Sequence, residues 1–175
     1  MPTTSSPCRA VILATGIVLA TLGQSTPVSA GQYWVAPDGD DRLDGTSRRT
    51  AWASPSRGQP TRTHEPVTRG GMRLPVYSTE GFLDSGRLRV GKLIVNYVAK
   101  TEREFVLAGP WPEDTAAFAR VYDADLLGGR SFAPGDVILL AGGEWVDRPL
   151  HFCQPGTPDH PITYRPAPGH RPRLV

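Results

Sequence analysis

The sequence predicts an all-β protein built from short strands that are joined by tight turns. Of its 175 residues, 19 are glycine and 18 are proline, while 39% are hydrophobic. The glycines follow no Gly-X-Y period, which excludes a collagen-like chain, and this composition is typical of many short extended segments. Apolar residues recur at every second position in several short runs. After residue 30, the only helix candidate is the segment 113–120, with Asp114 or Thr115 as its cap.

The charges argue against a protein dedicated to binding nucleic acids or membrane surfaces. Lysine and arginine total 19 and aspartate and glutamate total 17, so the formal net charge is only +2. Charges of both signs are mixed along the chain rather than gathered into runs, so no strong field of one sign is expected.

Residues 1–30 have the pattern of an export signal. Arg9 precedes an uncharged apolar stretch at 10–23, and Val28-Ser29-Ala30 places small residues at the third-last and last positions. The stretch is shorter than the roughly 20 apolar residues that span a bilayer, and a buried helix is the alternative. We expect a signal helix that is cleaved between Ala30 and Gly31. The product would be secreted, extracellular or periplasmic, with no remaining membrane association.

Cleavage would remove Cys8 and leave Cys153 without a partner for an internal disulfide. The apolar neighbours of Cys153 favour a buried thiol. A cysteine nucleophile is the alternative, because His151 would lie on the same face of a strand.

Residues 31–57 open with the apolar run Tyr33-Trp34-Val35 and continue into a turn rich in aspartate and glycine. Closely spaced carboxylates make Asp38, Asp40 and Asp44 weak candidates for calcium ligands. The helical calcium-loop pattern fails, because Arg42 and Arg49 occupy ligand positions. Hydrogen bonds from aspartate to the turn backbone are the favoured interpretation.

Residues 58–130 predict a meander of three or four short strands. Leu88 and Val90 alternate with other residues, as do Leu93, Val95 and Tyr97, and glycines stand where the chain would turn. Arg87 and Arg89 fall on the opposite face, which we expect to be solvated; a strip that binds polyanions is the alternative.

Residues 131–175 contain apolar runs cut by proline and glycine. Val137–Leu140 is a continuous apolar run between turn residues, which is typical of a strand that is buried on both sides in a parallel sheet. Short strands between tight corners predict one coil of a β-solenoid.

Two blocks of this chain resemble the opening of secreted right-handed parallel β-helix proteins of the pectate-lyase-like superfamily. The first block is Tyr33-Trp34-Val35-Ala36-Pro37-Asp38-Gly39 with Asp44-Gly45-Thr46 and Ala51-Trp52. The second is Pro134-Gly135-Asp136 with the following apolar run, Gly142-Gly143-Glu144-Trp145, Pro155-Gly156-Thr157 and Pro161-Ile162-Thr163-Tyr164. The resemblance implies a cap strand and turn at 31–57 and a first coil at 131–175, which would be truncated.

The segment between the two blocks is similar to a small β module of phage-tail and bacterial surface proteins. The similarity rests on Val76-Tyr77-Ser78-Thr79-Glu80-Gly81-Phe82, Ser85-Gly86-Arg87-Leu88-Arg89-Val90-Gly91 and Ile94-Val95-Asn96-Tyr97. It implies that residues 58–130 are an inserted, structural or interaction module.

The resemblance carries no catalytic residue over to this chain. In the polysaccharide lyases of the superfamily it implies calcium-bound carboxylates and a basic residue on the middle coils, and no position here matches those motifs. Lys92 and Lys100 belong to the insertion and are expected to face solvent. We therefore predict no catalytic site and no cofactor, with calcium only a weak option.

Three function classes remain. The first is a non-catalytic β-helix segment with a structural role or a role in binding a polysaccharide or cell-surface glycan. The second is the N-terminal fragment of a polysaccharide lyase or glycoside hydrolase that acts on an acidic polysaccharide. The third is a standalone β-rich binding protein, which is disfavoured because a solenoid needs about three or more stacked repeats.

The histidines and tryptophans give weaker signals. His64, His151, His160 and His170 are too scattered for a metal-ligand spacing, and the last two are expected to be exposed. Core packing is preferred over a sugar-stacking platform for Trp34, Trp52 and Trp145. Trp111, between two prolines, is the best candidate for an exposed aromatic side chain.

Overall fold

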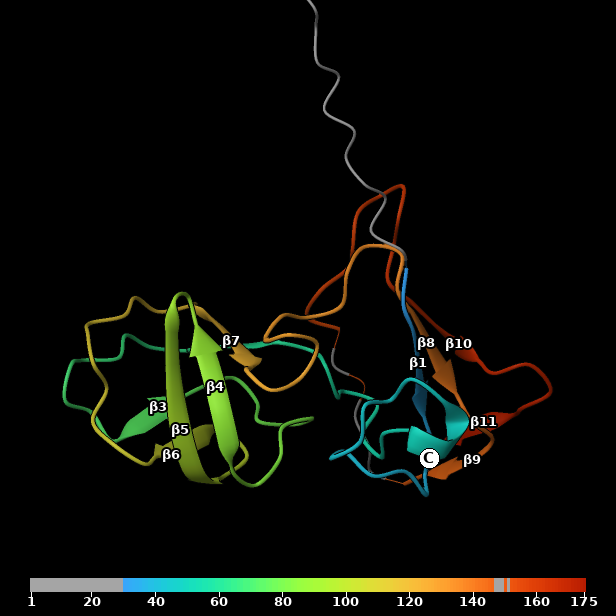
Figure 1. Ribbon diagram of the computed structural model, residues 1–175, viewed down its shortest axis with the longest axis horizontal. Helices are drawn as coiled ribbons and strands as arrows, with labels where there is room; N and C mark the ends of the chain where they lie inside the picture. The colour runs from blue at the N-terminus through green and yellow to red at the C-terminus, as the bar shows by residue number, and fades with distance from the viewer. Residues whose placement is uncertain (1–29, 147–149, 151) are drawn as a thin grey trace, which may run out of the picture.

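The computed structural model describes residues 30–146, 150 and 152–175, and in this part of the chain it is all-β, as predicted (Figure 1). Its only helical turn there is the 3-10 turn η1 (Arg48–Thr50), which Ser47 caps. The expected signal helix lies outside the described residues. No helix in the described part is long and apolar enough to cross a membrane.

Three strands form a parallel sheet in the order β1-β8-β10, drawn on the right of Figure 1. They are β1 (Gln32–Val35), β8 (Val137–Leu140) and β10 (Thr163–Pro166). The central strand β8 pairs with a parallel neighbour on each side, and Ile138, Leu139 and Leu140 are buried. The prediction of a buried strand in a parallel sheet is therefore confirmed at residues 137–140.

A second parallel pair joins β9 (Gly143–Trp145) to β11 (Pro172–Leu174). Each of its strands follows a strand of the first sheet along the chain, β9 after β8 and β11 after β10. Thr163 lies opposite Val137 and Pro172 lies opposite Gly143, so the chain returns to the same place after 26 residues (137 to 163) and 29 residues (143 to 172). The chain thus repeats one two-strand unit directly beside the first.

Between β1 and β8 the chain builds a separate six-stranded antiparallel sheet, on the left of Figure 1, in the order β2-β7-β4-β5-β6-β3. The predicted meander is present as β4-β5-β6, but a meander of three or four strands was too small a prediction. The extra strands have only two to four residues each, too few for a clear alternation. The bounds are β2 Thr61–Arg62, β3 Arg73–Pro75, β4 Gly86–Val90, β5 Leu93–Lys100, β6 Glu104–Leu107 and β7 Arg120–Asp123.

The predicted helix at 113–120 is wrong. Thr115 forms an antiparallel bridge with Val67, and each backbone N–H donates to the other residue's carbonyl, at 2.8 and 2.9 Å. These bonds use the groups that a helix would pair internally. Phe118 has a φ of 65°, which a right-handed helix does not accept.

Each sheet system has its own apolar core. The antiparallel core contains Leu74, Leu88, Phe105 and Trp111 among its buried residues. The parallel core contains Trp52, Phe132, Ile138 and Trp145. Within it the Tyr33 ring stacks on Trp52, with centroids 5.3 Å apart and planes 10° apart.

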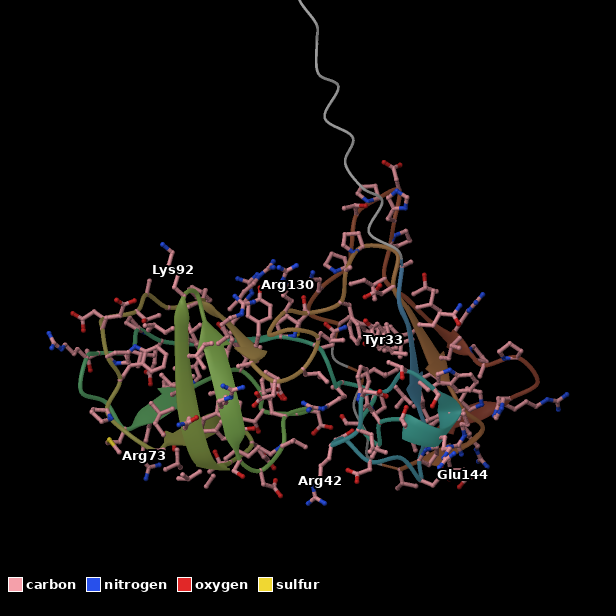
Figure 2. All side chains as sticks on the ribbon, in the orientation of Figure 1. Tyr33, Arg42, Arg73, Lys92, Arg130 and Glu144 are labelled. Carbon is pink, nitrogen blue, oxygen red and sulfur yellow. The ribbon has the colours of Figure 1, made fainter. Side chains whose placement is uncertain are left out.

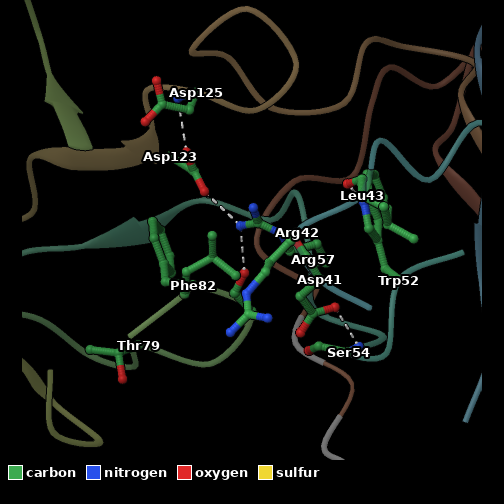
Figure 3. Close-up of polar contacts among 12 residues, drawn as sticks. Asp41, Arg42, Leu43, Trp52, Ser54, Arg57, Thr79, Phe82, Asp123 and Asp125 are labelled. Atoms are coloured by element: carbon green, nitrogen blue, oxygen red, sulfur yellow. Dashed lines mark hydrogen bonds and ion pairs between the residues drawn. The ribbon is translucent and has the colours of Figure 1, made fainter. Parts of the chain in front are cut away.

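Arg57 joins the two sheet systems (Figure 3). Its side chain is 4% exposed, and Nη1 lies 2.6 Å from Oδ2 of Asp123 at the end of β7. Nη1 also donates to the Gly81 carbonyl and Nε to the Asp41 carbonyl, both at 2.9 Å. One buried guanidinium therefore holds the turn after β1, the loop before β4 and strand β7 together.

A second link uses Gln59. Its amide nitrogen donates to the Tyr164 hydroxyl at 2.9 Å, and its amide oxygen accepts from the Cys153 backbone nitrogen at 3.2 Å. Both amide groups of Gln59 thus bind residues near or within the parallel sheet.

Candidate functional site

The three calcium candidates are engaged in turn interactions. Asp38 pairs with Arg48 at 2.8 Å, and this guanidinium holds the pKa of the Asp38 carboxyl below its usual value. Asp40 Oδ1 accepts from the Arg42 backbone nitrogen, and Asp44 Oδ1 accepts from the backbone and hydroxyl of Thr46, all at 2.9 Å. Within the described residues, no group of three or more His, Cys, Asp or Glu side chains could hold a metal ion.

Cys153 is exposed, so the expectation of a buried thiol is wrong. Its neighbour Phe152 is also exposed and packs edge-on against Tyr164 instead of entering a core. Partial burial of the thiol raises its pKa, with the charge of Arg62 acting in the opposite direction. A raised pKa is the reverse of what activates a cysteine nucleophile. His151, the suggested partner, lies outside the described residues.

The burial of the tryptophans differs in part from the prediction. Trp52 and Trp145 are buried as expected, and Trp34 is partly buried. Trp111 is buried, which overturns its choice as the exposed aromatic. Its backbone pairs with Gly70 and Gly71, and its Nε1 donates to the Thr115 hydroxyl at 3.0 Å. The flanking prolines do not keep it at the surface because this ladder folds the segment over the antiparallel core.

Lys100 and His170 depart from expectation, whereas Lys92 and His160 do not. Lys92 is exposed at the turn between β4 and β5, as predicted (Figure 2). Lys100 instead donates to the carbonyls of Thr79 and Phe82 in the loop before β4. His160 is exposed, but His170 is half-buried and its Nδ1 accepts from the Gly142 backbone nitrogen at 2.8 Å.

Three rings gather on the outer surface of the antiparallel sheet, and we call them the aromatic group: His64, Tyr77 and Phe118. The rings of Tyr77 and Phe118 lie 6.2 Å apart with planes only 22° apart, and His64 meets Tyr77 edge-on at 6.0 Å. Tyr77 is 48% exposed and Phe118 57% exposed. The rings therefore offer aromatic surface to a ligand rather than to the core.

Phe118 is held in this position by an unusual backbone. Its φ of 65° lies in the left-handed region, where a bulky side chain is an outlier with a cost of about 1–3 kcal/mol. Its nitrogen donates to the Thr63 carbonyl at 2.8 Å, and its own carbonyl accepts from Arg62 Nη1 at 3.1 Å. The surrounding bonds thus maintain a strained turn that presents an exposed ring.

Arg62 donates to the Phe118 carbonyl and so adjoins these rings; together with Arg89, Arg120 and Arg130 it makes up what we call the arginine group. Arg62 of β2 stands directly opposite Arg120 of β7, and both are exposed because their strand neighbours Thr61 and Val121 point inward. Like charges placed directly opposite destabilise a sheet. Arg89 is opposite Tyr122 in the next pair of strands, and its guanidinium lies 4.4 Å from the centroid of that ring.

Acidic side chains of the described residues do not neutralise the arginine group through ion pairs. Ion pairs in the described part of the chain involve Arg48, Arg57, Arg73, Arg87 and Arg173. None of them involves the arginine group. Arg89 also donates to the Gly129 carbonyl, which brings the exposed Arg130 to the same edge (Figure 2).

A cleft of about 400 Å³ adjoins the aromatic group. Its walls come from both sheet systems and include Gln59, Arg62, Tyr77, Glu80 and Cys153. A larger cleft of about 580 Å³ lies beside Asp40, Asp41 and Glu80. We favour the smaller cleft as the functional one, because in the larger one Asp40 and Asp41 already accept turn bonds and Phe82 is buried.

Sequence reasoning missed most of this surface. Of the two arginines of the polyanion alternative, Arg89 belongs to the arginine group, whereas Arg87 is paired with Asp125. Arg62 and Arg120 are far apart in sequence, so only the strand register brings them together. In comparisons with models of protein families, with curated proteins and with solved structures, nothing matches this chain.

Proposed function

We propose that this chain is a non-catalytic, secreted carbohydrate-binding segment, in which the face formed by the aromatic and arginine groups binds an acidic polysaccharide. The observation that carries the proposal is the placement of exposed, nearly parallel rings beside uncompensated arginines on one sheet face. Aromatic rings suit the apolar faces of sugars, while guanidinium groups bind carboxylates or sulfates in a bidentate manner.

The same proposal places the segment at the start of a right-handed parallel β-helix. The supporting observations are the parallel sheet β1-β8-β10 and the parallel pair β9-β11, whose strands alternate along the chain. In a solenoid each unit is stabilised by its neighbours. The antiparallel sheet would then be an inserted module that carries the binding face.

An acidic polysaccharide fits this face better than a nucleic acid does. The net charge of the chain is only +2. A nucleic-acid surface would need a more extended basic field. Spaced carboxylates on a sugar polymer require only a few arginines.

The binding test compares polygalacturonate with the same polymer after reduction of its carboxyls to alcohols, measured by isothermal titration calorimetry. We expect the reduced polymer to bind at least about tenfold more weakly, and added salt to weaken only the acidic polymer. Equal binding of both polymers would show that the arginines do not contribute to binding. If single-stranded DNA binds equally well and displaces polygalacturonate, the choice of a polysaccharide as the ligand is wrong.

Two variants assign the binding to the residues. Tyr77→Ala should weaken binding of both polymers, by about tenfold, whereas Arg120→Ala should weaken only the acidic polymer. Matched controls are Phe152→Ala, an exposed ring outside the aromatic group, and Arg49→Ala, an exposed arginine of the other sheet system. If a control lowers affinity as much as its partner, the assignment of the face is wrong.

The enzyme class is separated by one measurement. A lyase acting on polygalacturonate with calcium present releases unsaturated product, which absorbs in the ultraviolet. We expect no release by this chain. Release that Arg120→Ala abolishes would replace the binding proposal with a catalytic one.

A further inference from the structure

The backbone nitrogen of Gly31 lies against a buried carboxylate. It donates to Asp136 Oδ1 at 2.6 Å, while Asp136 Oδ2 accepts from the Ala133 backbone nitrogen at 2.7 Å. Asp136 is only 2% exposed, and no cationic side chain of the described residues forms an ion pair with it. A buried carboxylate that has hydrogen bonds but no positive partner is expensive to maintain.

A side chain at position 31 would crowd the Tyr33 ring. A Cβ at this position would lie 2.8 Å from the Tyr33 hydroxyl oxygen and 2.9 Å from a carbon of its ring. The Gly31 carbonyl accepts from the Val137 nitrogen at 2.9 Å, one residue after Asp136. Position 31 is therefore fixed at the point where β1 meets the turn before β8. Ala30, just before it, is exposed.

We propose that cleavage of the Ala30–Gly31 bond creates the missing positive partner of Asp136. A peptidase of the export system adds water across this amide, so that Ala30 leaves with a carboxylate and Gly31 keeps an amine. That amine is protonated at neutral pH. The new ammonium occupies the place of the present N–H and donates to Asp136 Oδ1, so that a hydrogen bond from an uncharged donor becomes a buried ion pair.

Processing in this proposal does more than remove the leader. The charge it creates strengthens the existing link between Gly31, at the start of β1, and the turn before β8. The inference rests on the predicted export signal and not on sugar binding, so either proposal can fail without the other.

The first test uses the full chain, expressed with its own leader and recovered after export. Mass spectrometry should find Gly31 as the first residue, and another first residue would overturn the proposal. The recovered chain is then unfolded, its N-terminal glycine is converted to the uncharged α-oxo acyl group by transamination, and it is refolded beside a mock-treated sample. Lys92 and Lys100 keep their charges in this reaction.

We expect the uncharged chain to have a melting temperature lower by about 3–6 °C. In the Asp136→Asn variant, the same treatment should change the melting temperature by less than about 1 °C. A second variant keeps the test valid if Asp136→Asn folds poorly. Inserting one alanine before Gly31 displaces the ammonium by one residue and should lower the melting temperature by a similar amount. Equal melting temperatures for the charged and uncharged chains would overturn the ion pair.

Discussion

The two sheet systems of this protein are stabilised in different ways. The antiparallel sheet encloses its own core, because strands from both ends of the segment 61–123 return to it and bury Leu74, Phe105 and Val121. The parallel system places β10 and β11 at sheet edges, with only partly buried or exposed residues. The antiparallel sheet thus closes its core by pairing the two ends of its own segment, whereas β10 and β11 have a partner strand on one side only within the described residues.

The largest expected effect comes from removing a core ring from one system at a time. Phe105→Ala should cost about 3–5 kcal/mol in the antiparallel core, and Trp52→Ala a similar amount in the parallel core. If the cores are independent, hydrogen exchange measured by mass spectrometry will show faster exchange mainly in the sheet that carries the substitution. Equal loss of protection in both sheets would show that they unfold as one unit.

The next effect tests the joint between the systems. Arg57→Ala leaves the Asp123 carboxylate without its partner and removes donors from the Gly81 and Asp41 carbonyls, so we expect a loss of about 3 kcal/mol in urea unfolding. It should also separate the unfolding of the two sheets into two transitions. Arg57→Met keeps the stem of the side chain and serves as the control for lost packing. Wild-type stability in both variants would contradict a structural role for this guanidinium.

A pH effect follows from Tyr164 in the parallel sheet. Burial of the phenol raises its pKa from 10.0 to about 12, so the folded state holds this proton more tightly than the unfolded state. The stability is therefore fully present below pH 10 and falls as the pH rises from about 10 towards 12. Tyr164→Phe should flatten this part of a plot of melting temperature against pH, and a plot as steep as that of the wild type would contradict the assignment.

The smallest effect is expected at the surface. The ion pair between Arg48 and Asp38 is exposed on both sides, so Arg48→Ala should change the free energy of unfolding by less than about 0.5 kcal/mol. A loss comparable to that of Arg57→Ala would mean that the turn after β1 matters more to the parallel system than its exposure suggests. Urea unfolding of the two variants side by side makes this comparison.

How much of this could be predicted from the sequence differs between the two systems. The continuous apolar run Val137–Leu140 and the alternation at residues 88–97 are local signals, and the strands that they predict are present as β8, β4 and β5. Strands β2 and β3 have two and three residues, and their partners β7 and β6 follow much later in the chain. Such strands are defined only by long-range pairing, so no local sequence pattern predicts them.

The candidate site was even harder to predict from the sequence. The sequence prediction placed the exposed aromatic at Trp111, but that ring is buried. Tyr77 and Phe118 are exposed instead, and no composition rule predicts the left-handed backbone of Phe118. The facing arginines Arg62 and Arg120 come from separate strands whose register sets their proximity. Properties of pairs of distant residues therefore remained hidden where properties of single strands did not.

The chain enters the segment that forms the antiparallel sheet close to the point where it leaves it, and this arrangement has an evolutionary consequence. Gly58 enters that sheet with a φ of 86°, and a Cβ there would lie 2.7 Å from the ring of Phe132, where the chain has left it again. Strands β1 and β8 are direct neighbours although the whole antiparallel sheet separates them in sequence. An ancestor with a short loop at this point could have gained the sheet in a single genetic insertion without rearranging the strands around it. The same junction is a natural place to graft another module.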